Sequence, residues 1–397
     1  MAGSKENVVS FHLALQPEEG VYADPGVNDI MAISAPDNGS DAITADDATL
    51  TGAIWAAPRL FLGRRGRAGA TMSLRGPGGS VVPAANAYMV GRVLQLAGFT
   101  EMRNATAITG TAAGGSDRSI ILAAAASGVT DFYKGMAIQH ANIGTGLIRG
   151  SSLIRDYDGA TKTARLMEIL GTAVAGGQYT IPPQLTYLLS TGASIPRASV
   201  KVVRHKKAYR YRDCALSSFA LNIPVANDES TDVPTIEFSM VGVPVRPNLD
   251  ETATPLPSSL LTPVAAAKDG KFALNGVKVG HQSIRFEFGL EAGALPNQNF
   301  QDGQESYETM SGTRTVSLDL NQTLVSLLDM DQVTDDQVQL AALSGWGRGP
   351  GNAFLVGMPN GYSDPFSPTG RNGFVAVQGN LAPSDVDRSI AISCLYA

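Results

Sequence analysis

Cysteine and charge are both scarce in this chain. Only two cysteines, Cys214 and Cys394, occur among its 397 residues, too few for the disulfide framework of a small secreted domain. We therefore expect reduced thiols and a cytoplasmic compartment. Charged residues make up 17% of the chain, below the roughly 25% of an average soluble domain. So low a share indicates a surface that is largely covered by neighbouring molecules.

Long hydrophobic runs and a basic excess are also missing. No stretch reaches the roughly 18 to 20 apolar residues of a membrane-spanning helix, so no membrane partner is expected. Residues 1–9 contain no apolar segment of the kind that a secretory signal requires, and no signal peptide is expected. The formal net charge is −6, which argues against a protein dedicated to gripping a nucleic-acid backbone.

The chain is rich in apolar residues and in turn formers. Hydrophobic residues make up 44%, and there are 43 glycines and 22 prolines. This composition excludes disorder throughout and favours a mainly β protein of two or three domains. Five segments alternate apolar and polar residues with the period of two that is typical of half-buried antiparallel strands. They lie at 9–15, 236–241, 284–290, 316–320 and 390–396.

Two helices are predicted, one in each domain. Pro83, at a first-turn position, precedes apolar residues at helical spacing, and Gly98 is a C-cap candidate. The second helix is predicted from Thr334 to Gly345, with Gln337 completing a capping box.

The sequence also contains an internal repeat, in which four short segments recur in the same order. We match 9–20 with 284–295, 70–77 with 314–321, 94–99 with 341–346, and 234–242 with 388–396. Each match is weak alone, but the shared order predicts two copies of one strand–helix–strand module.

The spacing within the two copies locates an insertion. Gly98 and Ile236 lie much farther apart along the chain than Gly345 and Ile390, so copy one is expected to hold an extra domain with strands of its own. The predicted divisions are copy one at 1–103 and 191–250, an inserted β domain at 104–190, a linker at 251–269, and copy two at 270–397.

No catalytic, metal or cofactor motif stands out. The four histidines lie far apart without partners at metal-ligand spacing, and Cys214 falls in a predicted strand, where a buried thiol is expected. Residues 156–159 begin like a calcium loop but lack its later ligands, which favours a tight turn. The glycine-rich run 345–351 follows a helix instead of opening one, and Pro350 removes a backbone donor, so phosphate binding is not expected.

Two basic clusters remain. One includes Arg64 and Arg65; the other is a predicted hairpin with tyrosines between its charges. The basic residues of this hairpin are Arg204, Lys206, Lys207, Arg210 and Arg212. Nucleic-acid contact through phosphate charge and base stacking is one interpretation. Pairing with acidic segments of a neighbouring subunit is the favoured one, because the chain is acidic overall.

Together these segments resemble the major tail tube protein family of long-tailed (siphophage-like) bacteriophages. The resemblance is carried by the helix-ending segment 93–102, by the charged hairpin with its S-S-F strand at 202–223, and by the hydrophobic strand at 233–245. It covers nearly the whole chain outside the insertion. It implies a mainly β fold of two tandem tail-tube-type β-sandwich or barrel modules, each with one helix, plus a small inserted β domain.

The same resemblance implies a structural virion protein and no enzyme activity. Subunits would polymerise into stacked rings that form the conduit for DNA ejection, assembled in the bacterial host cytoplasm and located in the virion tail. Expected partners are further copies of the chain and the tape measure, tail terminator and distal tail proteins; genomic DNA would transit the lumen without sequence-specific binding. Two modules per chain predict a homotrimeric ring of six modules, with a ring of six chains as the alternative.

Further expectations concern individual segments. The long loop at about 35–60 is predicted to contact the next ring, the inserted domain to lie on the tube exterior, and the charged hairpin to lie at a subunit interface. The predicted ring-stacking residues are Asp46, Asp47, Ile54, Trp55, Arg64 and Arg65. The competing hypotheses are a head-decoration or tail-fibre β protein and a glycan hydrolase, for which no pair of catalytic carboxylates is apparent.

Overall fold

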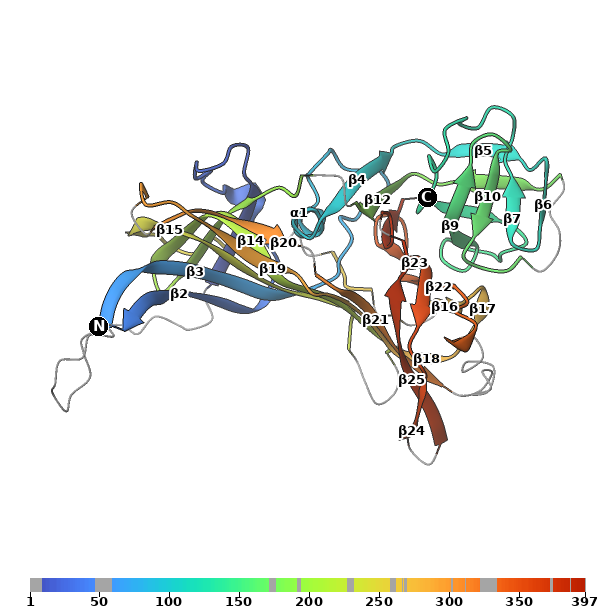
Figure 1. Ribbon diagram of the computed structural model, residues 1–397. Coiled ribbons are helices and arrows are strands. Elements are labelled where there is room, and N and C mark those ends of the chain that lie inside the picture. Colours follow the sequence, from blue (N-terminus) through green and yellow to red (C-terminus); the bar gives the residue numbers. More distant parts are fainter. Residues whose placement is uncertain are drawn as a thin grey trace.

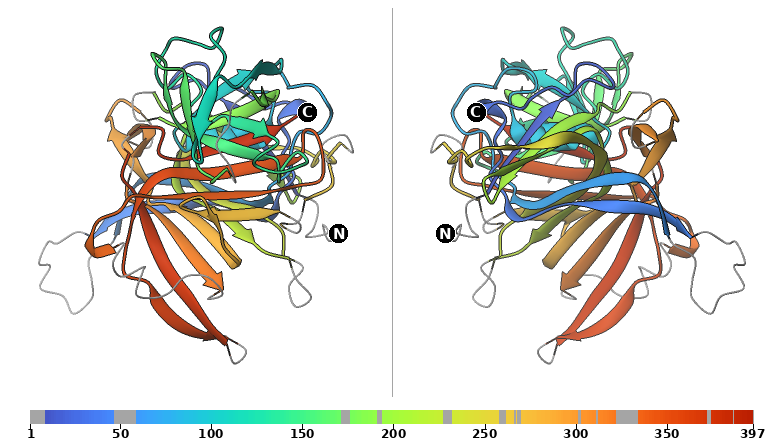
Figure 2. Two further views of the ribbon diagram at one scale, coloured as in Figure 1. Left: turned by 90° about the vertical axis from the view of Figure 1, so that its right-hand side faces the viewer. Right: turned by 90° about the vertical axis from the view of Figure 1, so that its left-hand side faces the viewer.

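The computed structural model describes most of the chain. The described residues are 9–46, 59–170, 176–190, 194–226, 232–257, 262–265, 267, 270–300, 303–310, 312–321, 334–371, 374–385 and 387–396. They form a mainly β protein of antiparallel sheets, as predicted, with a large 17-stranded sheet, a seven-stranded sheet and a two-stranded hairpin (Figures 1 and 2). No helix in the described part of the chain is long and apolar enough to cross a membrane.

Four strands at one end of the large sheet form what we call the first unit. Their order across the sheet is β2 (Ser34–Asp46), β3 (Arg59–Ser73), β15 (Thr235–Asp250) and β14 (Lys207–Pro224). The unit therefore consists of two long hairpins, β2–β3 and β14–β15, that pair side by side through β3 and β15.

Four further strands form the second unit in the same way. Their order is β18 (His281–Phe288), β21 (Arg314–Asn321), β25 (Phe374–Pro383) and β24 (Ser367–Arg371), with the end of β23 (Ala353–Ser363) continuing the line of β24 along β25. The two units join edge to edge, because β14 pairs with β18.

The two units also agree in register. The first hairpin of each unit is β2–β3 in the first and β18–β21 in the second. Asp37 faces Gly69 in one and Arg285 faces Ser317 in the other, so a constant shift, the same number added to both residue numbers of the first pair, gives the second pair. The same shift relates the first and second arms, by which we mean the outer ends of β2–β3 (43–46 and 59–63) and the hairpin of β19 (Glu291–Pro296) and β20 (Gln304–Met310). Both first hairpins step by one residue where the arm begins, between Ile43 and Thr44 in the first unit and between Phe288 and Glu291 in the second.

The second hairpins match equally well. Ala215 faces Val241 in β14–β15 as Tyr362 faces Ala382 in β23–β25. The register then steps by one residue in each hairpin, so that 220 faces 237 as 367 faces 378. The topology thus repeats, but through segments other than those matched in sequence: β18 takes the place of β2, and β25, not the last strand β26 (Ala391–Leu395), takes the place of β15.

The remaining strands of the large sheet, with two short helices, form a layer that packs against one face of the eight strands and encloses the main core. It includes η1 (Val27–Asp29) and α1 (Met89–Leu96), whose Val90, Val93 and Leu94 are buried. The first predicted helix is therefore present, six residues shorter at its start, and Gly98 follows it with a φ of 91° as a C-cap requires. The strands of this layer include β1 (Val9–Leu15), β4 (Phe99–Asn104), β12 (Gln184–Leu189), β13 (Ala198–Arg204), β16 (Lys271–Leu274), β17 (Val277–Lys278) and β22 (Leu340–Gly347).

The second predicted helix is wrong. Residues 340–347 form strand β22, which pairs with β16 and β23, and Gln337 has a φ of 50°, which a helix cannot contain. Leu340 to Trp346 are buried, so neither face of the segment is polar. A short, wholly buried apolar run does not distinguish helix from strand by its periodicity, and pairing on both edges decides the outcome.

The inserted segment forms its own seven-stranded sheet around a separate core. The strands are β5 (Ile108–Thr111), β6 (Gly114–Ser116), β7 (Ser119–Ile121), β8 (Ala137–His140), β9 (Ser151–Asp158), β10 (Thr163–Leu166) and β11 (Gln178–Ile181). β12, the last part of the segment, belongs instead to the large sheet, where it lies between β4 and β26. The insert is anchored by Lys271, which bonds Glu168 and the Ser151 carbonyl.

Candidate functional site

The junction between the two units within the chain is formed by strands β14 and β18. Residues 219–224 of β14 pair antiparallel with 283–288 of β18. Phe219 and Phe288 face each other with ring centroids 5.1 Å apart in an edge-to-face arrangement, and Phe99 completes the cluster at 5.6 Å from Phe288. Backbone pairing and aromatic packing together hold the junction.

The second arm reinforces this junction by folding over the first unit. Tyr307 of β20 is only 3% exposed, because it packs on Ala215, Val241 and Val243 of β14–β15. The Leu216 N–H donates to Thr309 Oγ1 at 3.0 Å. The arm thus covers the first unit where β13 and β18 leave β14 open.

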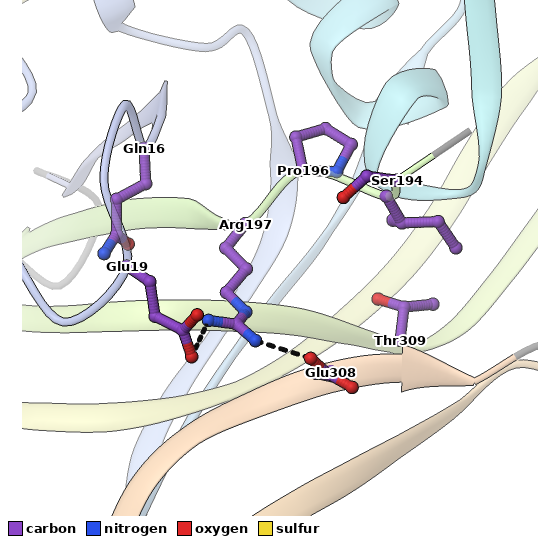
Figure 3. A pocket seen from close by; sticks show the side chains of 8 residues that line it. Gln16, Glu19, Ser194, Pro196, Arg197, Glu308 and Thr309 are labelled. Carbon is purple, nitrogen blue, oxygen red and sulfur yellow. Dashed lines mark hydrogen bonds and ion pairs between the residues drawn. The ribbon is translucent and has the colours of Figure 1, made fainter.

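An arginine in a cleft of about 420 Å³ fastens the arm (Figure 3). Arg197, which directly precedes β13, lies between Glu19 and Glu308 of β20, with Nη2 2.7 Å from Glu308 Oε1. Hydrogen bonds from Arg197 and then Ser306 lower the pKa of Glu19. Because Glu19 and Glu308 both pair with Arg197, we interpret the cleft as a structural contact that holds the second arm on the first unit.

The outer edges of the two units have no such cover. Within the described residues, β2 pairs with β3 alone and β24 with β25 alone. Tyr362 and Ala382, the counterparts of the covered Ala215 and Val241, are exposed; 42% of Tyr362 is accessible. Unpaired strand edges readily accept another strand. In the described segments of the chain, β14 and β18 thus form one junction between units. The outer strands β2 and β24 are the two edges that a second junction, between chains, would join.

One face of the eight strands is polar. The strands alternate, so that Phe238, Phe286 and Leu318 enter the core while Glu237, Glu287 and their neighbours face outward. The outward residues of β14, β15, β18, β21 and β25 on this face include Asn222, Glu237, Ser239, Arg285, Glu287, Ser317, Asp319, Gln378 and Asn380. This face carries more acidic than basic side chains, and Arg285 lies 3.5 Å from Glu237 and 3.7 Å from Glu287.

The structure brings together parts of the two predicted basic clusters. Arg64, Arg204 and Arg210 line one hollow of about 500 Å³ with Tyr209 and Tyr211. The Tyr211 hydroxyl donates to the Gly39 carbonyl at 3.0 Å, and burial raises its pKa. The hollow is a cationic surface at the free β2 edge.

The other predicted site residues lie elsewhere. Arg65 pairs with Asp41 at 3.5 Å, Lys207 with Asp250, and Arg212 with the buried Asp213; Lys206 occupies the exposed turn between β13 and β14. The long loop predicted at about 35–60 is wrong at both ends, because 35–46 belong to β2, whose last residue is Asp46, and 59–60 belong to β3. Asp47, Ile54 and Trp55 lie outside the described residues.

Burial shifts the pKa values of several histidines and of both cysteines. No three His, Cys, Asp or Glu side chains gather as a metal-binding group in the part of the chain that is described. Burial lowers the pKa of His12 and His140 and lowers that of His281 to about 4. Cys214 and Cys394 are free and buried, and burial raises the pKa of both thiols, that of Cys394 to about 12. Thiols with raised pKa values are poor nucleophiles at neutral pH.

Sequence reasoning missed the matching edges and the uncovered patch at Tyr362. Both features become visible only when the hydrogen-bond registers of the hairpins are compared. The residue types give no such signal, because Phe61 and Thr309 occupy equivalent positions but have chemically different side chains.

Comparison with known proteins gives no assignment: no protein-family model matches the chain, and no curated protein matches it either.

Proposed function

We propose that this chain is a structural virion protein, the tail tube subunit of a long-tailed phage, which closes into rings that stack into a tube. The single observation that carries the proposal is the edge-to-edge repeat of two four-stranded units with the same order and register. A unit that joins its own copy through a free edge, and leaves matching free edges at both ends, is suited to continue into a closed ring.

The internal junction predicts the register between chains. Residues 219–224 of β14 pair with 283–288 of β18. The constant shifts between units place β24, residues 367–371, against 35–39 of β2 in the next chain. Ring closure through this pairing satisfies both free edges.

We propose three chains per ring, which supply six four-stranded units. The two tail-tube-type modules of each chain then occupy equivalent places. A ring of six whole chains would instead leave the second unit outside the inner barrel. Stacking of rings through the segment beyond Asp46 is part of the same proposal.

The polar face described above is proposed to line the bore. Its carboxylates and its uncharged Ser, Asn and Gln side chains give no basic surface to hold phosphates, so DNA passes without sequence-specific binding. The net charge of −6 per chain acts in the same direction. The tape measure, tail terminator and distal tail proteins are the proposed further partners, and the inserted sheet is proposed to lie outside the tube.

Negative-stain microscopy of the purified chain tests the function. Stacked rings or straight tubes with an open bore are expected. Discrete particles that bind capsids or cells would support the head-decoration or tail-fibre alternative and overturn the proposal.

A further inference from the structure

The exposed first arm matches, residue by residue, an arm whose place is visible in the same chain. Thr44 faces Phe61 as Ala292 faces Thr309, and both pairs follow the same one-residue step in register. The second arm is folded over β14–β15. The first arm has no such surface to cover, because its own unit is the first in the chain.

Two large apolar side chains of the first arm are exposed. Phe61 and Leu62 are each 56% exposed, and they point to opposite faces of the arm, since successive residues alternate in a strand. Phe61 occupies the position of Thr309, on the face that touches the first unit; Leu62 occupies that of Met310, which is itself 52% exposed. Only the Phe61 face therefore needs a cover.

A surface of the right kind is uncovered on the second unit. Tyr362 and Ala382 stand where Ala215 and Val241 stand in the first unit, and they are exposed, whereas Ala215 is 1% and Val241 9% exposed under the second arm. Within the chain, the second arm already covers the first unit. In the described part of the chain, the first arm covers no surface, and no arm covers the surface at Tyr362 and Ala382.

We infer that the first arm of each chain folds over the second unit of the next copy, with Phe61 placed as Thr309 is, against the strand at Tyr362 and Ser363. This inference rests on the proposed ring. The partner is a second copy of this chain, since the contact repeats the one between the two units within a chain. The arm then acts as a strap across the junction of β24 with β2.

A cysteine pair tests the contact directly. Thr309 Oγ1 lies 3.0 Å from the Leu216 nitrogen, and the counterparts of these two residues are Phe61 and Ser363. The Leu216 side chain points into the core, whereas Ala215 faces the arm, so the second thiol belongs at Tyr362, the counterpart of Ala215. Phe61→Cys with Tyr362→Cys is expected to cross-link adjacent chains under mild oxidation, giving covalent dimers and closed rings on a non-reducing gel. The native cysteines are both buried and give a low background.

The matched control is Leu62→Cys with Tyr362→Cys, which places the first thiol on the opposite face of the arm and should cross-link at least tenfold less. Phe61→Ser should raise the protein concentration needed for ring formation about tenfold, from loss of one buried aromatic contact, while Leu62→Ser leaves it unchanged. Equal cross-linking of both pairs, or none in rings that microscopy shows to be intact, overturns the strap and leaves the proposed function standing. Absence of rings in the unaltered protein overturns the proposed function itself.

Discussion

Phe219 of the first unit packs edge-to-face on Phe288 of the second, with ring centroids 5.1 Å apart. The contact lies where β14 pairs with β18, so this aromatic pair marks the junction at which the two four-stranded units join in one sheet. Their side chains are 1% and 3% exposed.

Replacing Phe288 should therefore destabilise the whole chain. Phe288→Ala removes a buried ring and leaves a cavity, at a cost of about 3–5 kcal/mol in the free energy of unfolding. Chemical denaturation measures the loss. The exposed Met310→Ala is the control and should change stability by less than about 0.5 kcal/mol. Equal effects of the two changes would show that the junction does not stabilise the fold.

The buried ion pair that anchors the insert gives a second prediction. Lys271 is 4% and Glu168 2% exposed at the side chain, so Glu168→Ala leaves a buried ammonium without its carboxylate and should cost about 3–5 kcal/mol. Glu308→Ala breaks the more exposed pair with Arg197 and should cost about 1 kcal/mol or less. Thermal unfolding compares them. A Glu168→Ala variant as stable as Glu308→Ala would contradict the anchoring role.

His281 gives the fold a pH dependence. Its ring is tilted by 42° against that of Phe272, with centroids 4.7 Å apart, and burial lowers its pKa to about 4, below the roughly 6.5 of an unfolded histidine. The unfolded state binds the proton more tightly, so stability is present above pH 6.5 and is lost as pH falls towards 4. The loss between pH 7 and pH 5 should be about 2 kcal/mol.

Denaturation of the unaltered protein and of His281→Gln at both pH values measures this contribution. The lowered pKa values of His12 and His140 act in the same direction, so both proteins should lose stability, and the variant should lose less. Identical losses would show that His281 does not contribute.

The cationic hollow at the β2 edge should take part in assembly. Arg204→Glu places a carboxylate beside Arg64 and Arg210, removes a cation available to an acidic neighbour, and should raise the concentration needed for ring formation by about tenfold. Lys206→Glu, in the exposed turn next to it, is the control with the same charge change. Light scattering during assembly compares the variants. Equal effects of the two variants on the assembly concentration would show that only the net charge of the chain matters, and would contradict a role for the hollow.

The sequence predicts the class of fold well, because alternation of apolar and polar residues is a local signal. The strands at 9–15, 284–288 and 316–320 are present. The second predicted helix is wrong because pairing of β22 on both edges outweighs its local pattern. The sequence pattern predicts a repeat of four segments, whereas the structure repeats through other strands, with β18 in the place of β2 and β25 in that of β15. Short alternating strands resemble one another, so their pattern alone does not identify the equivalent pair.

The candidate site was less accessible to sequence reasoning. Arg64 and Arg204 were each noted for their charge, yet their meeting in one hollow depends on how β2–β3 and β13–β14 approach in space. Tyr362 becomes informative only when its equivalence to Ala215 is known, and that equivalence lies in hydrogen-bond register, not in residue type.

The number of chains in one ring tests the central claim most directly. Native mass spectrometry of isolated rings is predicted to give three times the chain mass of 41.4 kDa, because each chain supplies two equivalent units. A ring of six chains would contradict the equivalence of the two units, and a chain that stays monomeric at every concentration would contradict ring formation altogether.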